Sequence, residues 1–264
     1  MPEKKEVIHT AIWQELPAPD DPYAAETCYC RGFDVYGDLL QHASYVDYLY
    51  LLFKGEPPTA QHRRLLELLA MGLANPGPRD HSVRAAMNAG VIGAPAASML
   101  MAALAVGAGG LGGGQDVARA VLRWQALGTN LDAWQRDIQK PPEPAHDIWP
   151  DCEHPAGFDP NSDRCAPAYE QFLLRLCEAS AQGPLAWLSQ HRPQLEHIAN
   201  CGLSISGIAA TACYELGLSH HAAEMLYLLL RLPGAAVHAL EQQRQGWRRY
   251  PFFGQEFQLE APDS

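Results

Sequence analysis

Apolar residues recur at helical spacing over most of the chain. The pattern predicts amphipathic helices in residues 45–52, 59–73, 81–90, 115–127, 130–139, 168–179, 202–216, 219–230 and 235–245. Residues 93–107 are apolar on all sides, so we expect this helix to lie at the centre of the molecule. Together these segments predict an almost all-helical chain.

Local signals mark some helix ends. Thr59 follows two prolines and Ser219 precedes an apolar run, and both residue types suit the N-cap position. Pro233 predicts a break between the last two helices, because proline lacks the amide proton that the helix interior needs.

Three segments do not follow the helical pattern. Residues 17–23 form a loop rich in Pro and Asp, and residues 28–35 are β-prone, which favours a small strand or hairpin. Between residues 140 and 167 seven prolines are scattered among Asp, Asn and Gly. Long ordered loops often carry function. We therefore predict an all-α fold with little or no β-structure.

Composition narrows the classes of protein that fit. The 264 residues are 47% hydrophobic, which is typical of a globular protein, and the formal net charge of −11 argues against a nucleic-acid partner. We find no apolar run long enough for a signal peptide or a membrane span, so we expect a cytoplasmic protein. The seven cysteines lack CxxC spacing and are expected to be buried thiols.

Two motifs near opposite ends carry a family resemblance. RGFDVYGDLL (residues 31–40), followed by YVDYLYLLFKGEPP (45–58), is similar to the opening of citrate synthases and citryl-CoA lyases. LRLPGAAVHALEQ (230–242) and RRYPFFG (248–254) resemble the family's C-terminal helix and its arginine-containing final segment. With the glycine turn after residue 93, the resemblance covers about residues 28–253. The chain is thus similar to the citrate synthase superfamily, reduced in length.

The resemblance implies an architecture and a chemistry. It implies a citrate synthase-like helical unit with a large part (about 24–140 and 201–264) and a smaller part (about 141–200). Such proteins are usually homodimers with active sites close to the subunit interface. They make or break a carbon–carbon bond between a coenzyme A thioester and a carboxylic acid partner, and the thioester is a substrate, so no tightly bound cofactor is expected.

In that family one His stabilises the enol of the acyl-CoA, one Asp removes the α-proton, and a second His acts on the partner's carbonyl. Here GGLGGGQD (109–116) puts Leu111 in place of the first His, and ANCGLSIS (199–206) puts Gly202 in place of the Asp. Neither can donate a hydrogen bond or take a proton through its side chain. Ordinary citrate synthesis is therefore not expected. Whether Asp116 or Asp163 replaces the base is left open.

The second His is kept. EHPAGFDPNSDRCA (153–166) resembles the family segment that carries it, and assigns His154 to the carbonyl. Without the resemblance, His154 would read as a surface residue of a Pro-rich loop. The window 146–154 also holds several metal-capable side chains, but their spacing fits no zinc pattern, and no metal site is predicted.

Three arginines are candidate substrate ligands. Arg231 stands where the family has a carboxylate-binding arginine, and Arg248 or Arg249 matches the C-terminal arginine that often reaches the neighbouring subunit. The alternatives are an ordinary arginine near a helix end for Arg231 and a solvated basic cluster for the other two. The leading hypothesis is thus a citryl-CoA lyase-like enzyme. Its alternative is a non-catalytic homologue that binds an acyl-CoA or a partner subunit.

Overall fold

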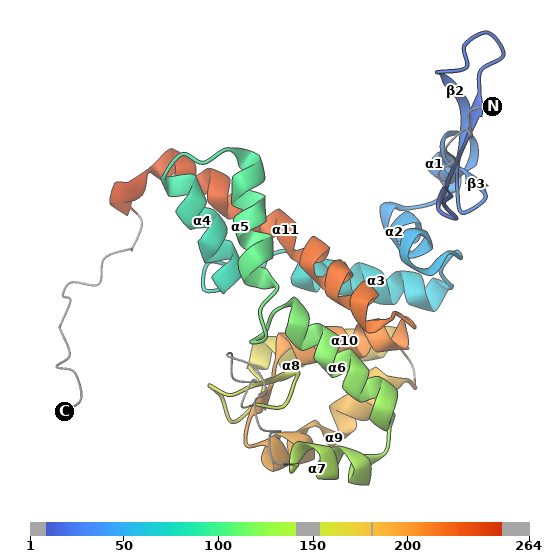
Figure 1. Cartoon of the computed structure of the whole chain (residues 1–264). Coiled ribbons are helices and arrows are strands. Elements are labelled where there is room, and N and C mark those ends of the chain that lie inside the picture. Colours follow the sequence, from blue (N-terminus) through green and yellow to red (C-terminus); the bar gives the residue numbers. More distant parts are fainter. Residues whose placement is uncertain (1–8, 141–153, 181, 250–264) are drawn as a thin grey trace, which may run out of the picture.

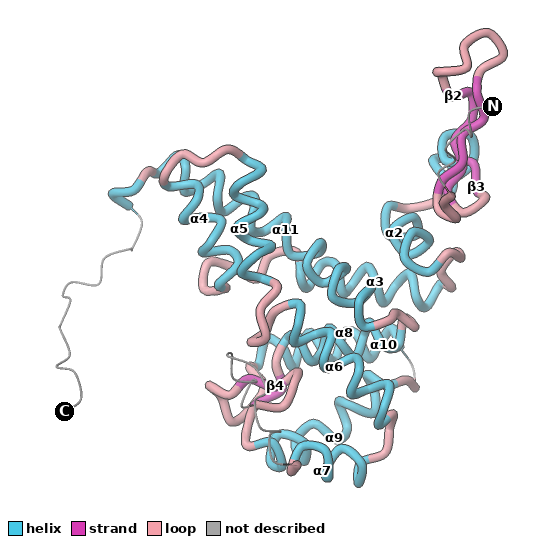
Figure 2. The backbone as a smooth tube through the Cα atoms, in the orientation of Figure 1, coloured by secondary structure: helices cyan, strands magenta, loops and turns pink. Residues whose placement is uncertain are grey.

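The computed structural model describes residues 9–140, 154–180 and 182–249, and these residues are mainly helical (Figures 1 and 2). The helices are α1 (Leu40–His42), α2 (Tyr45–Lys54), α3 (Ala60–Leu73), α4 (His81–Val91), α5 (Ala96–Gly107), α6 (Gly114–Leu127), α7 (Leu131–Ile138), α8 (Pro167–Ser180), α9 (Pro184–Ala199), α10 (Ile205–Glu215) and α11 (His220–Gln245), with a π-helix at Val35–Leu39 and a 3-10 turn at Trp247–Arg249. The all-α prediction is confirmed.

A small sheet forms an N-terminal arm. Strands β1 (Trp13–Pro17), β2 (Ala25–Cys30) and β3 (Phe33–Asp34) pair antiparallel in that order. Figure 1 shows this arm extending away from the helical body beyond α2. The predicted strand at 28–35 is confirmed by β2 and β3. The sequence did not predict β1, whose five residues are all exposed and so carry no alternation of buried and exposed positions.

The main core lies among α2, α3, α6, α7, α8, α9, α10 and the first half of α11. Trp124 is buried at its centre, packs edge-on against Trp134 at 4.9 Å between ring centroids, and donates to Thr211 Oγ1 at 2.8 Å. The core includes Leu69 from the predicted large part and Leu185 from the predicted smaller part. The boundary between those parts stays a prediction.

A smaller core joins α4, α5 and the second half of α11. It contains Val83, Ala86, Met99, Ala103, Ala235 and Ala239. The prediction that residues 93–107 form a central helix is wrong for the single chain, because α5 buries only Met99, Ala103 and Gly107. Met101 on the same helix is 60% exposed. An apolar helix therefore lies at the surface of the protomer.

Helix α11 continues through Pro233, so the predicted break is wrong. The next residue, Gly234, donates its amide proton to Ala74 O at 2.7 Å, at the end of α3. Packing against α3 thus replaces part of the lost helical hydrogen bonding. Of the helices described, α11 alone is long and apolar enough to cross a membrane, and 44% of its apolar window is buried within the protomer.

The predicted caps and thiols agree with the structure. Thr59 and Ser219 accept from the amides of His62 and Ala222, respectively. The sequence did not predict α9, which has Pro193 in its interior. Of the six cysteines described, all are free and five are buried, as expected.

Candidate active site

The glycine turn before α6 places an aspartate in the interior. In this turn a Cβ at Gly113 would lie 2.4 Å from Gly109 O, and Gly112 has a φ of +65°, so the run of glycines allows close backbone packing rather than phosphate binding. Leu111 points outward and is 47% exposed. Asp116, in the first turn of α6, is 1% exposed.

The Asp116 carboxylate is held by donors from distant parts of the chain. Gly157 N donates to Oδ1 at 3.0 Å, and Ser206 Oγ donates to Oδ2 at 2.6 Å. Ser206 Oγ lies 2.6 Å from Ser204 Oγ, which caps α10 by accepting from Gly207 N at 3.2 Å. The carboxylate therefore sits at the N-terminal turns of both α6 and α10, where helix dipoles favour negative charge.

Two effects on the proton affinity of Asp116 oppose each other. Burial raises the pKa of the carboxyl group, while the hydrogen bonds from Ser206 and Gly157 and the charge of His154 lower it, and the net shift is upward from the ordinary value of an aspartate. A buried carboxylate with a raised pKa is a better base than an exposed one.

His154 lies beside Asp116, close enough for the two side chains to interact electrostatically. Its Nε2 is buried and has no hydrogen-bond partner in the described part of the chain. Leaving a buried ring nitrogen without a partner costs about 1–3 kcal/mol. This nitrogen is therefore available to a ligand oxygen.

Hydrogen bonds from two other parts of the chain hold the backbone that follows His154. Arg123 Nη1 donates to Ala156 O at 3.1 Å, and its Nε pairs with Asp137 Oδ2 at 2.7 Å. Gly157 O accepts from Ser204 N at 3.0 Å. Beyond it, β4 (Phe158–Asp159) pairs with β5 (Gly202–Leu203), and in the view of Figure 2 β4 lies to the left of α6.

Gly202 lies in this strand pair, at a position that has no space for a larger side chain. A Cβ at this position would be 2.3 Å from Arg164 O, and the Gly202 amide donates to Ser162 O at 2.5 Å. Asp163, the other candidate base, is exposed in the same loop. Of the two aspartates that the sequence left open, Asp116 is the one that the structure brings to His154.

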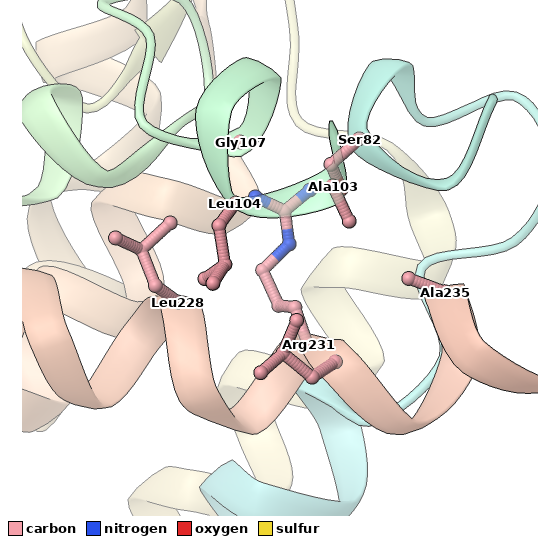
Figure 3. Close-up of a pocket in the computed structure, with 8 residues that line it drawn as sticks. Ser82, Ala103, Leu104, Gly107, Leu228, Arg231 and Ala235 are labelled. Carbon is pink, nitrogen blue, oxygen red and sulfur yellow. The ribbon is translucent and has the colours of Figure 1, made fainter. Parts of the chain in front are cut away.

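Arg231, on α11, approaches the glycine turn before α6 with Nη1 3.5 Å from Gly112 O, and Figure 3 shows the side chains around it. It is 5% exposed, forms an ion pair with Asp80 at the start of α4, and lies with its guanidinium 4.7 Å from the Tyr227 ring centroid. Tyr227 donates to Gly112 O at 2.8 Å, which ties α11 to the glycine turn. The cavity beside Arg231 is about 10 Å³, the size of one water molecule.

Arg248 and Arg249 do not join this site within one chain. They lie in the 3-10 turn after α11, and the 14 residues from Arg231 to Gln245 span roughly 21 Å along the helix. Arg248 instead lies over the Trp247 ring at 5.7 Å. The rest of the motif, residues 250–254, and the metal-capable residues 146–153 lie outside the described residues.

Two buried cysteines, Cys165 and Cys213, are poor candidates for a nucleophile. Burial raises the pKa of Cys165 and of Cys213 to about 12, so both thiols stay protonated near neutral pH. Among the residues described, no group of three or more His, Cys, Asp or Glu side chains is placed to hold a metal ion.

The helical arrangement is the citrate synthase-like fold. The solved structure of citryl-CoA lyase from Hydrogenobacter thermophilus is similar with a TM-score of 0.69 and 18% sequence identity, over 98% of this chain and 96% of that one. ATP citrate lyase from Methanothrix soehngenii, in complex with citrate and coenzyme A, is similar with a TM-score of 0.69 and 18% identity, over 99% of this chain and 43% of that one.

A mutant ATP citrate lyase from Methanosaeta concilii, in complex with (3S)-citryl-CoA, gives a TM-score of 0.67 and 19% identity, over 99% of this chain and 43% of that one. No protein-family model and no curated protein sequence matches this chain. At these identities the likeness shows the fold, and the chemistry has to be argued from the site itself.

Proposed function

We propose that the protein is a lyase or acyltransferase that breaks or forms a carbon–carbon bond in a coenzyme A thioester. One observation carries the proposal, namely the buried Asp116 beside a His154 whose Nε2 is unpartnered. An α-proton of a thioester is very weakly acidic, so its removal needs a base held away from water, and a hydrogen-bond donor at the partner's carbonyl oxygen favours formation of the new bond. Similarity to proteins solved with coenzyme A, citrate and citryl-CoA supports the substrate class.

The two side chains take complementary roles. In the condensation direction Asp116 removes the α-proton, the new bond forms to the carbonyl carbon of the partner, and the carbonyl oxygen, hydrogen-bonded by His154, takes up a proton. Cleavage is the reverse. Because Asp116 is 1% exposed, a substrate reaches it only after the residues that cover it move apart.

Proton exchange tests this function without knowledge of the partner. Acetyl-CoA incubated with the protein in deuterium oxide should gain deuterium at its methyl group, as measured by mass spectrometry, because Asp116 removes and returns the α-proton. A panel of 3-hydroxyacyl-CoA thioesters should be tested for release of acetyl-CoA in parallel. If the protein catalyses neither the exchange nor any cleavage, the proposal is refuted.

His154 should affect turnover more than binding. Replacing His154 with Ala should lower kcat by roughly 10²-fold with a small change in KM, because the hydrogen bond forms to an oxygen that gains charge in the transition state. His197, exposed on α9, provides the control, and His197→Ala should leave kcat unchanged. Equal loss in both variants would contradict the assignment.

One observation favours the alternative of a non-catalytic binding protein. Asp116 and Arg231 are both nearly inaccessible and already bonded within the chain. If a coenzyme A thioester raises the melting temperature of the wild type and of the His154 variant alike, with no turnover in either, the binding function is the correct one.

We further propose that the protein is a homodimer through α5 and α11. The support is a group of exposed apolar side chains on these helices: Met101, Val106, Val237 and Leu240. Solvent exposure of an apolar helix is unfavourable, and a second copy covering it would remove that cost. In such a dimer we expect Arg248 and Arg249, which follow the C-terminal end of α11, to reach the partner's site.

Light scattering should give twice the chain mass of 28.9 kDa at micromolar concentration. The double variant Met101→Glu and Val237→Glu should be monomeric, because charges are costly to bury in an interface. Leu174→Glu, at a 56% exposed position on α8, is the control and should remain dimeric. A wild-type monomer would refute the interface.

A further inference from the structure

Asp80 and Arg231 form an ion pair between the start of α4 and the middle of α11. The two Asp80 oxygens have separate partners. Oδ1 accepts from the amides of Ser82 at 2.9 Å and Val83 at 3.4 Å, which caps α4, and Oδ2 pairs with Arg231. The cap fixes the carboxylate in front of the guanidinium.

The remaining surface of the Arg231 guanidinium is also covered. Its face lies over Tyr227, and Nη1 is 3.5 Å from Gly112 O in the turn that leads to Asp116. Ser82, Leu104 and Gly107 close the side toward α4 and α5 (Figure 3). Arg231 thus lies near the turn that leads to Asp116, and its guanidinium group is not open to a ligand carboxylate.

The sequence resemblance assigns Arg231 to a carboxylate of the substrate's acid partner, and here a carboxylate of the chain itself occupies that arginine. We propose that Asp80 is a specificity-determining residue, and that the carbonyl partner is a neutral aldehyde or ketone rather than a keto acid. This inference rests on the proposed lyase function.

Asp80 excludes a substrate carboxylate by its negative charge as well as by occupying Arg231. A substrate carboxylate at this position would meet the Asp80 carboxylate that already pairs with Arg231, and like charges repel strongly at short range away from water. The substrate class is then a 3-hydroxyacyl-CoA with an alkyl or aryl group on C3. Its hydroxyl loses a proton, the C2–C3 bond breaks, and C2 of the departing acyl-CoA gains a proton.

Two thioesters that differ only at C3 test the proposal. 3-Hydroxybutyryl-CoA carries a methyl group there and malyl-CoA a carboxylate, and cleavage of each releases acetyl-CoA. The wild type should have a kcat/KM at least about 10-fold higher for 3-hydroxybutyryl-CoA. Asp80→Asn keeps the helix cap but frees Arg231, and should shift the ratio toward malyl-CoA by about 10-fold or more.

Asp47→Asn is the matched control. Asp47 also takes part in a helix cap, as the N3 residue of the capping box of α2, and pairs with an arginine, Arg63. Its replacement should leave the substrate preference unchanged. A wild type that prefers malyl-CoA overturns the specificity inference while the lyase function stands.

A second measurement does not depend on turnover. Asp80→Ala leaves Arg231 unpaired, so sodium acetate should raise the melting temperature of this variant by several degrees more than sodium chloride at equal ionic strength, and should not do so for the wild type. If neither thioester is cleaved, the lyase function and the substrate class fail together, while the acetate result still decides whether Asp80 fills a carboxylate site. If acetate has no specific effect on the melting temperature of Asp80→Ala, the claim that Asp80 fills a carboxylate site is refuted.

Discussion

Replacing Asp116 with Asn should lower thioester turnover by about 10³-fold, because a buried amide cannot accept the α-proton. Asparagine has nearly the same shape, and its carbonyl oxygen can still accept from Gly157 N or Ser206 Oγ. The variant should therefore fold, and the loss should appear in kcat and in deuterium exchange of acetyl-CoA rather than in the amount of soluble protein.

The pH dependence separates this role from a structural one. Below its pKa Asp116 is protonated and cannot act as a base, so kcat/KM should fall as the pH decreases. Because burial raises that pKa, the fall should begin at a higher pH than for an ordinary aspartate. Asp163 is the exposed candidate, and its replacement with Asn should change neither the kcat/KM near neutral pH nor its fall at low pH. A full loss of activity in Asp163→Asn with none in Asp116→Asn would reverse the assignment.

The sequence offered Asp116 and Asp163 as possible replacement bases and could not choose between them. The choice depends on contacts that join Asp116 to Ser206, 90 residues away, and to Gly157, 41 residues away. No local pattern encodes such contacts. Likewise, Arg231 has the spacing of a substrate ligand, but the ion pair with Asp80 across 151 residues became visible only in the folded chain.

The fold was predicted best where local chemistry decides it. Thr59 and Ser219 cap their helices as expected, because a side-chain oxygen satisfies amides that any helix start leaves free. Proline misled the prediction where tertiary contacts compensate. Pro193 and Pro233 lie inside α9 and α11, and Gly234 donates to Ala74 O instead of continuing the helical ladder.

The apolar helix α5 shows a different limit. Apolar residues on every side predict a helix covered on every side. Among the described residues, α5 packs mainly against α4 and α11. Hydrophobicity predicts that a surface becomes buried and does not distinguish burial in the same chain from burial by a second one.

Gly202→Asp, which would restore the carboxylate at the family's position, should destabilise the protein instead of activating it. The new Cβ would lie 2.3 Å from Arg164 O and 2.9 Å from Arg164 N, and both are backbone atoms that cannot rotate away. The substitution also brings a charge into a buried strand pair. Together these effects should lower the free energy of unfolding by at least about 2 kcal/mol.

For a chain of this length a loss of about 2 kcal/mol corresponds to a melting temperature roughly 4 to 8 °C lower, measurable by calorimetry. Leu111→His, the other substitution toward the family pattern, is the matched comparison. Because Leu111 is exposed, that variant should melt within about 1 °C of the wild type. A stable Gly202→Asp variant that gains activity would show that the strand pair β4–β5 opens and that the base belongs at Gly202 rather than at Asp116.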